Sequence, residues 1–168
     1  FAKDGKNLIV AAGKSPKFWN IESGIMTSPF YETAGKVIAI DYYKDLVAYA
    51  SGTNIYVWNI DTGKRVIALK DTSKVFSISF SHDGKMIAAG YDKDRINNVV
   101  VWDVNTGLKL AEFGRKTKNA TINNITAIDF SNNNKTIIAA DEMNFIVTVW
   151  GESIDSLNDF STKPVNWS

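Results

Sequence analysis

The feature that most constrains this 168-residue chain is a strand-like segment ending in tryptophan that recurs roughly every 40 residues. In its fullest copy, residues 99–107 (VVVWDVNTG), three β-branched residues lead into a tryptophan, an aspartate and an Asn-Thr-Gly turn. Residues 16–24 and 55–63 keep most of this pattern, whereas residues 146–150 keep the strand and the tryptophan but lack the turn. The recurring residues are Trp19, Trp58, Trp102 and Trp150. Such self-similarity predicts a repeat architecture.

Two further segments precede each tryptophan strand. A near-continuous apolar run is typical of a strand covered on both faces, and it occurs at residues 7–13, 45–52, 85–90 and 135–141. Before it comes an alternating segment that ends in an aromatic residue, at 37–42, 75–80 and 125–130. A weaker apolar segment follows the tryptophan turn. Each repeat is therefore predicted to form four short antiparallel strands, and no segment shows strong helical periodicity.

The third copy carries the clearest resemblance to a known family. Residues 80–85 (FSHDGK), 86–90 (MIAAG) and 99–107 resemble the WD40 repeat, and the other copies extend the resemblance over nearly the whole chain. The resemblance implies an all-β fold, a β-propeller made of four-stranded antiparallel WD40-like blades. The family's Gly-His pair is absent, since the only histidine is His82, and a literal Trp-Asp pair occurs only at Trp102-Asp103. We therefore expect the blades to depend on apolar packing, without the family's buried His-Ser-Asp-Trp network.

The repeats divide the chain into approximate units. We place them at residues 1–34, 35–72, 73–118 and 119–163, with 164–168 starting a further blade. Because rings of this family usually close with about seven blades, we expect the chain to be a segment of a longer propeller. An oligomeric closure and a small complete ring are the alternatives. Trp19, Trp58, Trp102, Asp103 and Trp150 are expected to be structural markers of the repeat.

The composition leaves little room for catalysis. The chain has no cysteine and one histidine, which excludes disulfides, thiolate metal sites and most nucleophile–base pairs. We expect no metal, no cofactor and no enzymatic activity, and no apolar run reaches the ~18 residues of a membrane span. Asp41 and Asp129 occupy the same position in their repeats. Hydrogen bonding to backbone groups is the favoured role, and a cation site or an acid–base pair is the alternative.

Two connections are longer than the repeat requires, and both contain basic residues. They are predicted as loops at residues 91–98 and 114–124, and they emerge on the same face of a four-stranded blade. Loops on a rigid scaffold often carry function. The residues predicted to contact a partner are Tyr91, Lys93, Arg95, Arg115, Lys116 and Lys118.

The resemblance implies a non-enzymatic protein–protein interaction scaffold, a subunit of a multiprotein complex in the cytoplasm, with the nucleus as the alternative location. A second hypothesis is a quinoprotein-like propeller that binds a cofactor or small molecule at its axis, since residues 61–64 (DTGK) resemble blade turns of that class. Direct nucleic-acid binding is not expected, because the net charge is only +1 and the basic loops lack interleaved aromatic residues.

Overall fold

Every regular element of the described chain is a β-strand. The computed structural model describes residues 2, 4–28, 30, 35–93, 96–116, 124–141 and 147–150. Their strands form separate antiparallel sheets in which sequence neighbours pair through hairpins. The predicted all-β class with four-stranded antiparallel sheets is therefore confirmed.

The sheets follow one another along the chain. The first sheet contains β1 (Asn7–Ala12), β2 (Ser15–Asn20) and β3 (Met26–Thr27). The second contains β4 (Val37–Tyr43), β5 (Leu46–Ser51), β6 (Asn54–Asn59) and β7 (Lys64–Lys70). The third contains β8 (Lys74–Phe80), β9 (Met86–Lys93), β10 (Ile96–Asp103) and β11 (Lys109–Lys116). The fourth contains β12 (Ile125–Phe130), β13 (Ile137–Asp141) and β14 (Val147–Trp150).

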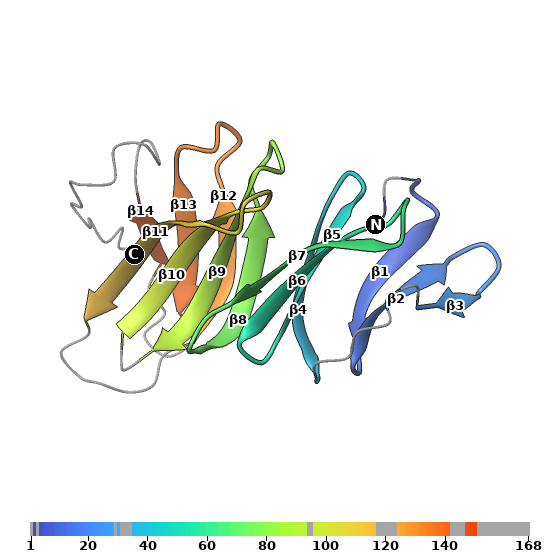
Figure 1. Ribbon diagram of the computed structural model, residues 1–168, viewed down its shortest axis with the longest axis horizontal. Coiled ribbons are helices and arrows are strands. Elements are labelled where there is room, and N and C mark those ends of the chain that lie inside the picture. The colour runs from blue at the N-terminus through green and yellow to red at the C-terminus, as the bar shows by residue number, and fades with distance from the viewer. Residues whose placement is uncertain are drawn as a thin grey trace, which may run out of the picture.

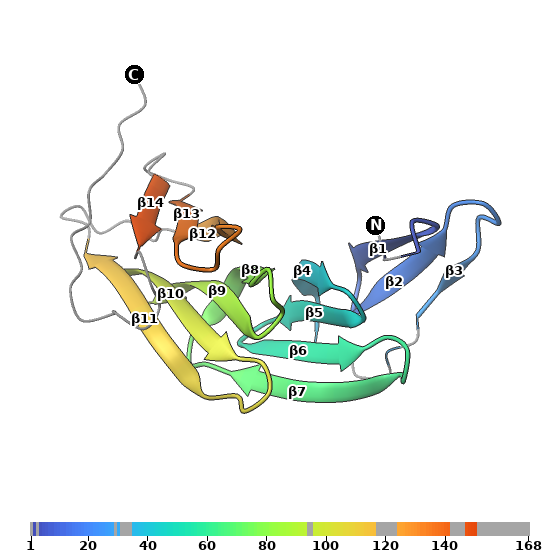
Figure 2. The same cartoon turned by 90° about the horizontal axis from the view of Figure 1, so that it is seen from above.

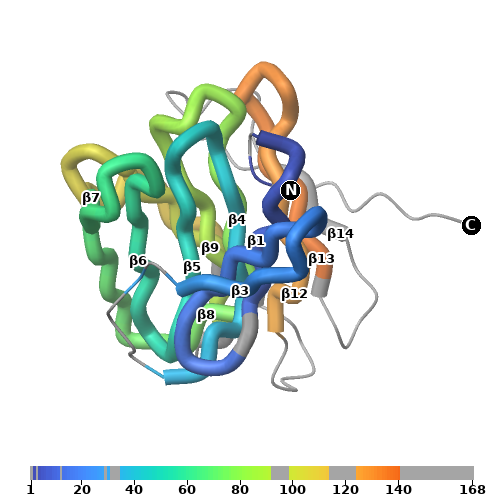
Figure 3. The backbone as a smooth tube through the Cα atoms, turned by 90° about the vertical axis from the view of Figure 1, so that its right-hand side faces the viewer, coloured from blue at the N-terminus to red at the C-terminus, as the bar shows by residue number. Residues whose placement is uncertain are grey.

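The sheets stand side by side as an open arc (Figure 2), with β4, β8 and β12 on the inner side and β7 and β11 on the outer side. Closure into a ring is not seen in the described ranges. The β4–β5, β8–β9 and β12–β13 turns gather at one end of the molecule, at the top of Figures 1 and 3. We call this the hairpin end. The opposite end, with the β5–β6 turn and the β7–β8 passage from the second sheet to the third, is the linker end.

A separate apolar core fills each joint between neighbouring sheets. The strand β5 shows why, because its successive side chains alternate between two joints. Val47 and Tyr49 pack toward the first sheet with Phe18 and Phe30, whereas Ala48 and Ala50 pack toward the third sheet. These four residues of β5 are completely buried. The prediction that the apolar runs form strands covered on both faces is therefore confirmed for β5, and the small alanines leave room for the neighbouring sheet.

The repeated tryptophans lie at matching register positions. Trp58 pairs with Val47 and Trp102 pairs with Ile87 on the preceding strand of the sheet. In both sheets a β-bulge falls directly before the tryptophan in its pairing with the next strand. Trp58 and Trp102 are 6% and 8% exposed, and each packs in the core shared with the preceding sheet. Trp19 is 42% exposed, because no described residue covers that face of the first sheet.

Apolar packing replaces hydrogen bonding around Trp58, as the missing family histidine predicts. Its ring lies 5.4 Å from the Phe30 ring, in a tilted arrangement. The Trp58 indole N–H is buried and has no hydrogen-bond partner among the described residues. The ring is therefore held by contact area rather than by a polar network.

Polar contacts join the inner strands to one another. Asp41 on β4 accepts a hydrogen bond from the backbone N–H of Phe80 on β8, at 2.6 Å. Ser79 on β8 donates to Asp129 on β12, at 3.2 Å. The favoured backbone-bonding role is thus confirmed for Asp41. Burial raises the pKa of the Asp41 carboxyl, and the nearby Asp129 charge adds to that rise against the opposing hydrogen bonds.

The turns at the hairpin end also join neighbouring sheets. Gly84 adopts a positive φ of 72°, as its Asp-Gly turn predicts, and a Cβ there would collide with the ring of Tyr43 in the preceding sheet. One sheet further on, Asn134 adopts a φ of 58° and accepts a hydrogen bond from the backbone N–H of His82. His82 is thus an exposed turn residue with a structural contact.

Substitution of the tryptophans tests the joint packing. We expect Trp58→Ala to lower the unfolding free energy of the 168-residue chain by about 3–5 kcal/mol, because it removes a buried aromatic ring. Trp19→Ala, at the matching position in the first sheet, should cost less than half as much, because its ring is partly exposed. Chemical denaturation followed by circular dichroism measures both. Equal losses would contradict the assignment of the tryptophan to the joint.

The Asp41 contact predicts a defined pH dependence. Since burial raises its pKa in the folded state, folded protein binds this proton more tightly than unfolded protein does. The contribution of Asp41 to stability should therefore fall as the pH rises from below the ordinary value of 3.8 through the folded-state pKa. Denaturation at several pH values should show Asp41→Asn gaining stability relative to wild type as the pH is raised from below 3.8. A difference that is constant over this range would show that the carboxyl is not perturbed.

Candidate interaction surface

The predicted partner-binding residues lie around the linker end of the third sheet. The structure gives backbone positions for Lys93 at the end of β9 and for Arg115 and Lys116 at the end of β11. Arg95 and Lys118 lie outside the described residues.

The pairing register brings these backbone positions together. Ile96 at the start of β10 pairs with Lys93 on one side and with Lys116 on the other. Arg115 pairs with Asn97, the next residue of β10. The expectation that the two basic segments meet at one end of the sheet therefore agrees with the register of these backbone positions. Contact with a partner stays a prediction.

The prediction of a long loop at residues 91–98 is wrong. The pairs Tyr91–Asn98, Asp92–Asn97 and Lys93–Ile96 continue the β9–β10 hairpin almost to its tip. The strand β11 extends with them to Lys116, which shortens the second predicted loop. An extended β10 exposes backbone donors and acceptors on its other edge, and pairing with β11 satisfies them. The backbones of Lys93, Arg115 and Lys116 thus lie together at the end of three paired strands, β9, β10 and β11, which we call the basic corner.

The prediction that Tyr91 lies at the surface and contacts a partner is also wrong. Its side chain is 1% exposed and belongs to the core between the second and third sheets. This burial raises the pKa of the Tyr91 phenol above its ordinary value. Residue 91 falls on the inward-facing side of β9 with Ile87 and Ala89, as strand alternation requires. Tyr91 therefore supports the basic corner through its packing in the core between the second and third sheets.

The linker end also holds two lysines that the sequence reasoning missed. Lys36 directly precedes β4, and Lys74 is the first residue of β8, so both precede the same valine in their repeats. Both are exposed, and both line a hollow of about 440 Å³. An alignment of the second and third repeats would have found the pair, because it places Lys36 and Lys74 at equivalent positions.

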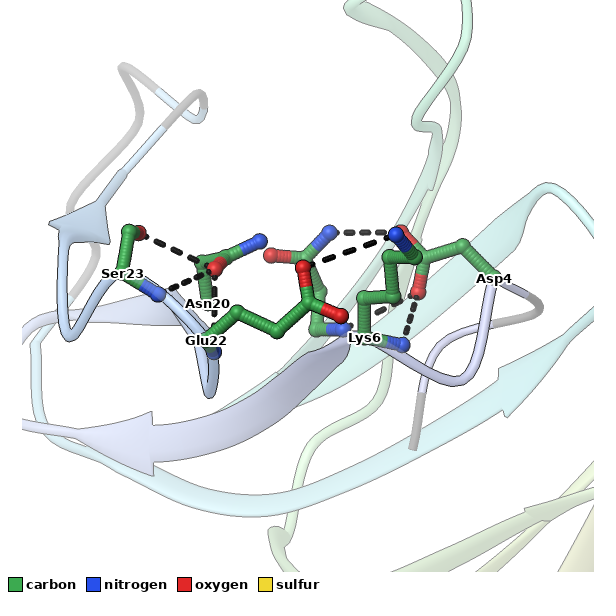
Figure 4. A network of polar contacts seen from close by, with 6 residues as sticks. Asp4, Lys6, Asn20, Glu22 and Ser23 are labelled. Atoms are coloured by element: carbon green, nitrogen blue, oxygen red, sulfur yellow. Dashed lines mark hydrogen bonds and ion pairs between the residues drawn. The ribbon is translucent and has the colours of Figure 1, made fainter.

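In the first three copies, the residue after the tryptophan caps the following turn. Asp103 Oδ1 accepts from the backbone N–H of Thr106 at 2.7 Å and from its hydroxyl at 2.9 Å. These hydrogen bonds lower the pKa of Asp103. Asn59 and Asn20 perform the same function, accepting from the N–H of Thr62 and of Ser23, and Figure 4 shows the Asn20 turn. A neutral amide thus replaces the aspartate in the first and second copies, and Asp103 has a structural role.

The structure also places two of the other expected repeat markers, Trp102 by its side-chain contacts and Trp150 by its backbone pairing. Lys109 Nζ lies 5.2 Å from the centre of the Trp102 ring and also binds Asp71 and Glu112. Trp150 pairs with Ile137 at the backbone level, in the same register as Trp102 with Ile87.

The described residues contain no group of three or more His, Cys, Asp or Glu side chains that could hold a metal ion. No helix in the described ranges has the length and apolar character needed to cross a membrane. Asp41 and Asp129, the sequence's candidate for an acid–base pair, are bonded to Phe80 N–H and to Ser79.

Comparison with known proteins agrees with this architecture. The family described as the Anaphase-promoting complex subunit 4 WD40 domain matches residues 42–133, more than half of the chain. The protein named WD repeat-containing protein slp1, from Schizosaccharomyces pombe, is 36% identical over 81 residues. That alignment covers 42% of this chain and 16% of the relative's own length. The family match runs from the end of β4 through β12 and includes the two tryptophan strands β6 and β10, which lie in matching register. Since it covers more than half of the chain, the chain belongs to the WD40 repeat family.

Proposed function

We propose that this chain is a non-catalytic scaffold that binds partner proteins through its linker end, as a subunit of a multiprotein complex. WD40 repeat domains are generally non-catalytic and typically serve as protein-interaction scaffolds. The matched family is described from a subunit of a large assembly, which supports the complex-subunit part of the proposal. A cytoplasmic location stays a prediction.

The observation that carries the proposal is the basic corner of the third sheet. The register collects Lys93, Arg115 and Lys116 at the backbone level, and Arg95 is close to Lys93 in sequence. The corner rests on a buried core that includes Tyr91 and Val99. A cationic surface on a preorganised support favours rapid and specific association with an acidic partner.

The corner can be tested by charge reversal. We expect the double variant Arg95→Glu/Lys116→Glu to reduce recovery of specific partners at least tenfold in quantitative affinity purification from the source cells. The reason is that like charges then face an acidic partner surface. The thermal unfolding midpoint should stay within about 2 °C of wild type, as expected for a charge change that weakens binding without unfolding the domain.

A matched control is available at the hairpin end. Lys85→Glu/Lys135→Glu changes the net charge equally at two exposed positions. It should leave partner recovery unchanged. Equal loss in both double variants would show a general charge effect, and unchanged recovery in the Arg95/Lys116 variant would contradict the proposed binding surface.

A further inference from the structure

The linker end of the second sheet is hollowed beside the basic corner. The hollow has a volume of about 440 Å³, within the usual range of ligand sites. Its walls are the start of β4 (residues 35–38), Ser51 and Gly52 at the β5–β6 turn, and Lys74 at the start of β8. Three separate segments therefore converge on one depression.

The charged residues known to line the hollow are both cations. Lys36 and Lys74 are exposed, and neither forms an ion pair with a described carboxylate. Lys74 Nζ lies 5.1 Å from the centre of the Phe76 ring, and the backbone of Asp92 is opposite Lys74 in the register. Because the two lysines come from adjacent sheets whose joint is buried, their backbones are held at a fixed separation.

A buried hydroxyl without a partner adds a second kind of evidence. Ser51 is 1% exposed, and its Oγ makes no hydrogen bond within the described residues. Buried polar groups are nearly always hydrogen-bonded, so this hydroxyl has an unused donor at the wall of the hollow. Gly35 keeps the space next to it open, since a Cβ at residue 35 would approach Ser51 Oγ to 3.3 Å.

Neighbouring backbone groups are already used by the fold. The carbonyl of Gly52 accepts from Val75 N–H at 2.9 Å, and Val37 N–H donates to the carbonyl of Gly13 at 2.9 Å. These two bonds fix the strand starts that carry the lysines. The polar side chains identified on the wall are thus two ammonium groups, which donate hydrogen bonds, and one hydroxyl, which can donate one.

We infer that this hollow binds the anionic group of an acidic peptide segment, a carboxylate or a phosphate, presented by a partner protein. The inference rests on the proposed function, because it gives the chemistry of a partner that binds at the linker end. Two ammonium groups and a hydroxyl suit an oxyanion. A nucleic-acid ligand is disfavoured, because the known lining includes no aromatic side chain on which a base could stack.

A titration of the whole chain with short peptides tests the hollow directly. The probes are Ac-Gly-phosphoserine-Gly-NH2 and Ac-Glu-Glu-Glu-NH2, followed by the amide NMR signals of the ¹⁵N-labelled protein. We expect saturable shifts of Gly35, Ser51, Gly52 and Lys74 with a dissociation constant near 1 mM, as suits a small surface site. A phosphopeptide that binds more tightly than the glutamate peptide assigns the site to phosphate, and the reverse order assigns it to carboxylate.

Variants separate a built site from general attraction to positive charge. Lys36→Ala/Lys74→Ala should weaken peptide binding at least tenfold, and Ser51→Ala about threefold, with unchanged thermal unfolding. The control Lys85→Ala/Lys135→Ala removes the same charge at the hairpin end and should change affinity less than twofold. Equal weakening in the control, shifts spread over all exposed lysines, or tighter binding of an oligouridylate at the same amides would overturn the inference.

Partner recovery distinguishes failure of the hollow from failure of the proposed function. Partner binding that is retained by Lys36→Ala/Lys74→Ala but lost by Arg95→Glu/Lys116→Glu contradicts the hollow and supports the basic corner. Binding that is retained by both variants contradicts the proposed surface, while loss in both, together with the peptide titration, supports the two proposals.

Discussion

Face-to-face packing between successive sheets is the interaction on which the rest of this structure depends. A single four-stranded sheet of short strands has two faces to bury and cannot bury either alone. Here each joint has its own apolar core, and Trp58 and Trp102 place a large ring against the preceding sheet. Trp19, the matching tryptophan of the first sheet, is partly exposed because no described sheet packs against it.

The inner strands make this packing specific. Apolar contact alone would allow one sheet to slide along the next, because it is not directional. Directional bonds prevent sliding: Asp41 accepts from Phe80 N–H at one joint, and Ser77 donates to the carbonyl of Ile125 at the next, at 2.6 Å. The glycine at residue 90 has the same effect, since a Cβ there would overlap Ile125. The resulting fixed geometry also holds Lys36 and Lys74 on either side of one hollow.

Local pattern was sufficient to predict most of the strands. The β-branched run before Trp102, the apolar run before it and the Asp-Gly turn at Gly84 all carry short-range signals, and the structure has strands and a left-handed turn there. The extension of β9 and β10 was missed because a segment rich in Asp, Lys and Asn has low strand propensity. Pairing on both edges of β10 overrides that propensity. The wrong surface placement of Tyr91 has the same cause, since Tyr91 is buried only because residue 91 continues the alternation of the strand.

The binding surface was only partly predictable for a different reason. Loop length and the presence of basic residues pointed to Lys93 and Lys116, because both lie in connections that are longer than the repeat requires. Lys36 and Lys74 are isolated lysines in sequence, and they acquire a common site only through the joint between two sheets. A buried hydroxyl such as that of Ser51 has no sequence signature, since its importance lies in the partner that it lacks.

Native-state hydrogen exchange tests the central claim, that the joints make neighbouring sheets interdependent. The amides of β5 and β6 in the second sheet and of β9 and β10 in the third should open with one common free energy in low denaturant, because opening of either sheet exposes the core that the two share. Exchange of β5 and β6 at a clearly lower free energy, with β9 and β10 still protected, would show that the sheets fold independently and would contradict this account.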